Sequence, residues 1–98
     1  MKYKAMPSSY ANRDIARLAE ILAPYPSKAR RLFKEMEQKL DLLENNPYMC
    51  PPYHANSKYR CMTLEGHALF YTVDDEKREI NIYRVIYVRR DIERLLGE

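Results

Sequence analysis

The sequence lacks several features that mark whole classes of protein. No apolar run approaches the roughly 18 residues that a membrane-spanning helix needs. Charge but no apolar segment follows the first methionine, so we expect no signal peptide and a cytoplasmic location. Cys50 and Cys61 are the two cysteines, and without a secretion signal both are predicted to be reduced thiols. His54 and His67 are too few and too scattered to suggest a zinc site with them.

A strong excess of one charge is also missing. The chain has 17 basic and 14 acidic residues, and the basic surplus lies in residues 1–49. Because nucleic-acid-binding domains often carry a stronger bias, an argument for nucleic acid must rest on local clusters. Tryptophan is absent whereas nine residues are tyrosines, which stack on bases but are also ordinary strand residues. With 98 residues, 46% apolar, the chain is expected to be one soluble globular domain over residues 1–98.

The first half of the chain predicts a short strand and a helical hairpin. The strand is expected over residues 2–6. Apolar residues then recur at helical spacing from Ala11 to Leu22 and again from Ala29 to Leu43. Pro24 and Pro26 separate the two stripes, so two helices are expected to pack as a hairpin.

The second half predicts a meander of three strands. Residues 47–57 read as a connecting loop, followed by strands over Tyr59–Leu64, His67–Val73 and Glu79–Val88, with a helical turn in Arg89–Leu96. The short turns between the strands favour antiparallel pairing. The predicted class is therefore α+β, in the order β-α-α-β-β-β-α. Its antiparallel sheet carries the N-terminal helical hairpin on one face and leaves the other face partly open.

The last predicted strand is apolar on both faces. Alternation places Ile80, Ile82, Ile86 and Val88 on one face with Arg84, and Tyr83, Val85 and Tyr87 on the other. A strand of this kind is typical of a central position, covered on both sides.

Three segments together resemble a known group of proteins. Tyr59-Arg60, the run from Gly66 to Tyr71 and the run from Ile82 to Asp91, with Asn45–Met49 and the hairpin before them, are similar to the RelE/ParE superfamily of bacterial type II toxins. The resemblance covers essentially the whole chain. It implies one of two activities, because RelE-like members cut mRNA in the ribosomal A site whereas ParE-like members inhibit DNA gyrase without cutting nucleic acid. It also implies a small antitoxin that wraps the toxin.

The resemblance suggests site residues near the end of the last strand. RNA cleavage by the substrate's own 2′-hydroxyl needs proton transfer and stabilisation of charge on the phosphate. Tyr87 stands where many relatives carry a histidine, so it is the candidate for proton transfer or base stacking; the alternative is a plain rim residue. Arg90 matches the basic residue that contacts the scissile phosphate, with Arg89 beside it. The alternative for Arg90 is an ion pair with Asp91 or Glu93.

Three further residues have both a functional and a structural interpretation. Arg60 is expected to face the substrate or to be a plain surface residue. Arg84, placed among isoleucines, is expected to pair with a carboxylate such as Glu35 or Asp91, with substrate contact as the alternative. His67 is a second group for proton transfer, or a surface residue beside a turn.

The first hypothesis is ribosome-dependent mRNA cleavage without metal or other cofactor, leaving a 2′,3′-cyclic phosphate. In it Arg60, Arg89 and Arg90 grip phosphate and Tyr87 acts on the proton or the base. The partners would be the ribosome, mRNA and an antitoxin whose acidic side chains meet residues 84–90. Ala68 replaces a basic residue of RelE-like enzymes, which leaves room for the second hypothesis, a gyrase inhibitor. The third is an interaction module without toxicity.

Overall fold

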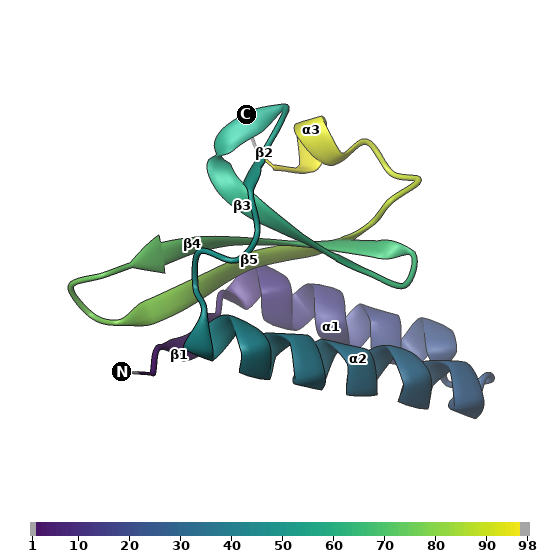
Figure 1. Ribbon diagram of the computed structural model, residues 1–98. Coiled ribbons are helices and arrows are strands. Elements are labelled where there is room, and N and C mark those ends of the chain that lie inside the picture. Colours follow the sequence, from purple (N-terminus) through teal and green to yellow (C-terminus); the bar gives the residue numbers. More distant parts are fainter. Residues whose placement is uncertain (1, 97–98) are drawn as a thin grey trace.

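Residues 2–96, which the computed structural model describes, form three helices and five strands (Figure 1). In chain order these are β1 (Lys4–Pro7), α1 (Ser9–Leu22), α2 (Pro26–Asn45), β2 (Pro52–Tyr53), β3 (Asn56–Leu64), β4 (His67–Asp74), β5 (Glu79–Tyr87) and α3 (Ile92–Leu95). The predicted α+β class and the hairpin of α1 and α2 are confirmed. The short strand β2 is new, because it arises within the predicted connecting loop.

Local sequence explains where the two long helices begin. The Ser8 hydroxyl caps α1 by accepting a hydrogen bond from the Ala11 amide at 3.0 Å. α2 begins at Pro26, where a missing amide proton costs nothing because first-turn amides have no partner in the helix. The corner predicted from Pro24 and Pro26 is therefore where the chain turns.

The sheet has the strand order β1-β5-β4-β3-β2. β3, β4 and β5 form the predicted antiparallel meander, and Gly66, at φ 72°, takes the left-handed conformation that its first tight turn requires. β1, however, runs parallel to β5, from Lys4 opposite Glu79 to Pro7 opposite Ile82. The sheet is therefore mixed at this edge, and the expected antiparallel label holds for the meander.

A bulge interrupts the pairing of β4 with β5. Phe70 lies opposite Arg84, but the next residue, Tyr71, lies opposite Ile82. Tyr83 is thus an extra residue on β5, and such an insertion reverses the side to which every later side chain points.

The bulge corrects the predicted faces of the last strand. Ile80 and Ile82 share the core between sheet and hairpin with Val85, which was expected on the opposite face. Ile86 lies in the other cluster. Val88 lies beyond the end of β5 and is 48% exposed. Strict alternation fails here because it counts every residue of the strand as paired.

The buried side chains form one cluster on each side of the sheet. The larger cluster lies against the hairpin and includes fully buried Leu43, Leu69 and Tyr71. The smaller one, around Phe70, is covered by Leu96 and the side chains of α3. Figure 1 shows the hairpin under the sheet and α3 above it. The face expected to be partly open is therefore partly covered. No helix within residues 2–96 has the length and apolarity to cross a membrane.

Candidate functional site

A groove with a volume of about 620 Å³ lies where the tip of the hairpin meets the β3–β4 turn and the end of β5. We call it the hairpin groove. Its floor is aliphatic, from Leu18, Ile21, Leu22 and Val85, and its rim carries three cations, Arg17, Lys28 and Arg90. An apolar floor with a few convergent polar groups is the usual make-up of a binding site.

The groove contains an aromatic pair at the ends of two neighbouring strands. His67 and Tyr87 lie opposite each other in the β4–β5 register, with ring centres 5.4 Å apart and planes tilted by 49°. The Nδ1 atom of His67 lies 3.0 Å from the Glu65 carbonyl oxygen. The side chain of Tyr87 is 45% exposed. Two of the predicted proton-transfer groups are therefore side by side at the groove and accessible.

Arg90 completes the set of predicted residues at this site. Its backbone amide donates to the Tyr87 carbonyl at 3.0 Å, which turns the chain sharply after β5. Its side chain lines the groove. Asp91, offered as an ion-pair partner for Arg90, instead lies 3.5 Å from the Arg94 guanidinium. Arg89, its exposed neighbour, does not line the groove.

Arg84 makes the structural pair that was expected, but with a different carboxylate. Its Nε and Nη2 atoms donate to the two Asp14 oxygens at 2.7 and 3.0 Å. Glu35, one of the predicted partners, accepts from the Glu65 amide and pairs with Lys39. The hydrogen bonds to Asp14 raise the pKa of Arg84 above its ordinary value, against the opposite effect of desolvation. The prediction of Glu35 or Asp91 was wrong because the sequence does not reveal that α1 lies along β5.

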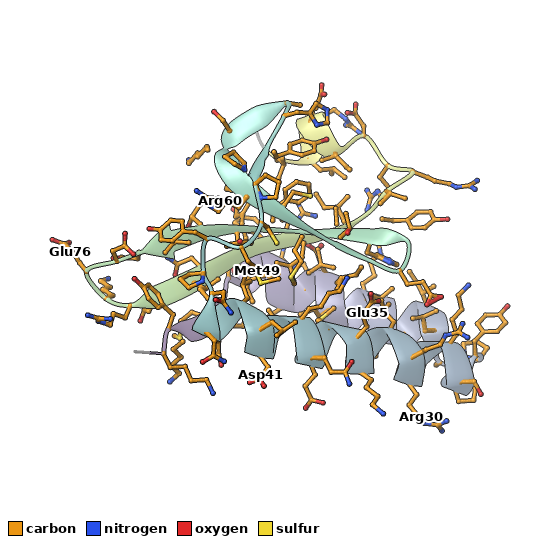
Figure 2. All side chains as sticks on the ribbon, in the orientation of Figure 1. Arg30, Glu35, Asp41, Met49, Arg60 and Glu76 are labelled. Carbon is orange, nitrogen blue, oxygen red and sulfur yellow. The ribbon has the colours of Figure 1, made fainter. Side chains whose placement is uncertain are left out.

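Arg60 lies away from the hairpin groove. It is opposite Tyr71 in β4, four residues before the β3 residue that faces His67, which is about 13 Å along the strand. Its Nη1 atom donates to the Cys50 carbonyl at 2.6 Å, and its guanidinium lies 4.8 Å from the centre of the Tyr48 ring. Figure 2 shows Arg60 and Arg30, a residue near the hairpin tip, in well-separated parts of the molecule. The structure thus separates Arg60 from Tyr87 and Arg90.

Two cations of the groove were missed in the sequence. Arg17 precedes Leu18 of the apolar stripe of α1, and Lys28 lies in the first turn of α2. Both positions flank a buried stripe, which is the available signal, but only the docking of the hairpin shows that they share a groove with Arg90.

The groove carries a net positive charge. Its two carboxylates are already paired: Asp14 with Arg84, and Glu65 with Arg31 at 3.4 Å. Within residues 2–96, none of the three rim cations forms an ion pair. An anionic partner would therefore meet three cations that no carboxylate of the described chain neutralises.

A second polar cluster ties the far end of the sheet together. Asp75, in the β4–β5 turn, accepts hydrogen bonds from the hydroxyls of Tyr3 and Tyr48, at 2.6 and 2.5 Å. These bonds lower the pKa of Asp75 and raise the pKa of each tyrosine. Among residues 2–96, no group of three or more His, Cys, Asp or Glu side chains is placed to hold a metal ion.

Comparison with known proteins identifies the family. The sequence model described as "ParE toxin of type II toxin-antitoxin system, parDE" matches residues 6–92. The chain belongs to the ParE toxin family. Its membership confirms the predicted RelE/ParE resemblance and the role of a type II toxin. No curated protein matches the sequence.

Two solved structures show the fold of this family. The chromosomal ParDE system from P. aeruginosa has a TM-score of 0.69 and 18% identity, covering 88% of this chain and 96% of that chain. The toxin–antitoxin complex RelBE2 from Mycobacterium tuberculosis has a TM-score of 0.60 and 22% identity, covering 89% and 99%. At these identities the likeness shows a common fold, and it includes both a ParE-named and a RelE-named system.

Proposed function

We propose that this ParE-family toxin arrests growth by binding and inhibiting DNA gyrase, without cutting RNA. The observation that carries the proposal is the dispersal of the predicted phosphate-gripping arginines. Arg60 donates to the Cys50 carbonyl at a distant part of the sheet, and Arg84 is held by Asp14. Arg90 alone, of these three, lines the groove with Tyr87.

RNA cleavage makes a demand that this arrangement meets poorly. In-line attack by a 2′-hydroxyl needs a base, an acid and positive charge converging on one phosphate within hydrogen-bond reach. An arginine already engaged by a buried carbonyl or a carboxylate is a weaker partner for that phosphate. A binding protein, in contrast, needs an accessible surface with apolar and charged parts, which the hairpin groove supplies.

The test is plasmid supercoiling by purified gyrase, with the toxin added in the absence of ribosomes. We expect inhibition that Arg90→Ala weakens by at least tenfold in half-inhibitory concentration. Lys77→Ala, at an exposed cation of the β4–β5 turn, should inhibit like the wild type. Supercoiling that proceeds normally at saturating toxin would reject the proposal. Harmless expression without an antitoxin would favour an interaction module instead.

The second candidate is the ribosome-dependent endoribonuclease, and one observation favours it. His67, Tyr87 and Arg90 share the groove, which brings two proton-transfer groups and one phosphate-binding group together. Translation in vitro followed by primer extension tests it. Cuts that require ribosomes and disappear in Tyr87→Phe and Arg90→Ala would establish this activity and overturn the gyrase proposal.

The groove also suits an antitoxin. The two structural neighbours are toxin–antitoxin systems, which supports a cognate antitoxin as partner. An aliphatic floor and a cationic rim match an acidic segment with aliphatic side chains on one face. We therefore place the acidic part of the antitoxin on the hairpin groove, next to residues 84–90. Normal antitoxin affinity of an Arg17→Glu, Lys28→Glu double variant would contradict this placement.

A further inference from the structure

The edge of β5 changes partner part-way along the strand. β1 pairs with β5 only as far as Ile82. Beyond it, the Ser8 hydroxyl donates to the Tyr83 carbonyl at 2.7 Å, and the Val85 amide donates to Asp14 at 3.0 Å. α1 thus satisfies polar groups of a strand edge that has no neighbouring strand there.

Arg84 connects this edge to the C-terminal helix. Besides its two hydrogen bonds to Asp14, its Nη1 atom donates to the Leu95 carbonyl at 3.1 Å. α1 and α3 lie on opposite sides of the sheet (Figure 1), so one guanidinium joins elements of both sides around the edge. The side chains of Arg84 and Asp14 are each 16% exposed, which limits screening by water.

The segment that Arg84 holds has little other support. α3 has four residues, too few to be stable as an isolated helix. Leu96 is buried and anchors its end, but Val88, Arg89 and Arg90 are all exposed. The path of these three residues is therefore set by the two ends of the segment, which are the end of β5 and the docked α3.

We propose that Arg84 and Asp14 form a latch that holds α3 against the sheet and thereby fixes Arg90 at the hairpin groove. Arg84 is in this sense a positioning residue that acts through Arg90 and does not touch the partner. Asp14 is needed because it orients the guanidinium with a two-point contact, which a lysine does not reproduce.

Hydrogen exchange and limited trypsin digestion test the latch without any assay of toxicity. In Asp14→Asn and Arg84→Lys we expect the amides of Leu95 and Leu96 to exchange about tenfold faster, together with faster cleavage after Arg89 and Arg90. The control is Glu65→Gln, which removes an exposed ion pair of the same groove and leaves α3 untouched.

The result that supports the latch is local. Amides of the central strand β4 should keep their protection relative to one another while the α3 amides lose theirs. Unchanged exchange in α3 would overturn the proposal. So would acceleration by the same factor in every element, because that would report global destabilisation.

A second arm rests on the proposed function, since it reads growth arrest. Asp14→Asn should weaken arrest in the wild-type background but cause no further loss in an Arg90→Ala background. Losses that multiply independently would show that the pair does not act through Arg90, which also overturns the proposal. A chain without toxicity would refute the proposed function alone, because the exchange arm would still decide on the latch.

Discussion

Replacing Arg60 by methionine should destabilise the fold, although the sequence marks this residue as a candidate for substrate contact. Methionine keeps an unbranched stem but removes the guanidinium, which donates to the Cys50 carbonyl and lies over the Tyr48 ring. Cys50 is only 8% exposed, so its carbonyl has little access to water as a substitute donor. The lost charge-assisted hydrogen bond corresponds to about 1.5 kcal/mol, and the cation–π contact at the exposed Tyr48 to about 0.5 kcal/mol. The free energy of unfolding should therefore fall by about 2 kcal/mol, or roughly 10 °C in Tm for a chain of this size.

Urea unfolding followed by circular dichroism measures this loss. The matched control is Lys58→Met, which removes an exposed cation two residues earlier on β3 and should change the free energy by less than about 0.5 kcal/mol. If Arg60→Met were as stable as the control, the structural assignment of Arg60 would be refuted. The side chain would then be available to bind phosphate, and the endoribonuclease hypothesis would regain its second arginine.

Three other predictions concern the core, the tyrosine-bound carboxylate and the groove. Leu43→Ala should lower the free energy of unfolding by about 3 kcal/mol because Leu43 is fully buried, whereas Leu42→Ala, at a half-exposed position, should lower it by under about 1 kcal/mol; equal losses in urea would contradict the packing. The pKa of Asp75 is lowered in the folded state, so its stabilising contribution is present above about pH 4 and lost as the pH falls below. Asp75→Asn should therefore be less stable than the wild type at pH 7, with a gap that narrows at pH 2.5; a constant gap would show that the ionised carboxylate is not the cause. The double variant Arg17→Glu, Lys28→Glu should associate with the antitoxin roughly tenfold more slowly at low salt, and a rate deficit that persists in 1 M salt would exclude an electrostatic cause.

The parts of the fold that local sequence specifies were predictable. Helical spacing of apolar residues and the two prolines of the corner defined the hairpin, and Gly66 marked the turn between β3 and β4. The pairing of β1 was not, because Lys4–Pro7 contains nothing that names Glu79–Ile82 as its parallel partner. The bulge at Tyr83 leaves no local mark either, since a tyrosine fits a regular strand equally well.

The candidate site divides in the same way. Strand-end positions pointed to His67, Tyr87 and Arg90, and the structure places all three at one groove. Arg17 and Lys28 were missed because their membership depends on where the hairpin tip docks. The partner of Arg84 was misjudged for a related reason: Asp14 is 70 residues away in the chain and becomes adjacent only because α1 replaces a strand beside β5.

The parallel pairing of β1 with β5 also constrains the order in which a nascent chain can fold. α1 and α2 make local contacts and can form as soon as they leave the ribosome, whereas β1 must wait until residues 79–82 have been synthesised. The end of β5, the Arg90 turn and α3 follow still later. During translation the chain therefore carries an assembled hairpin but no groove, so the surface assigned here to target and antitoxin comes into being only with the last residues of the described chain.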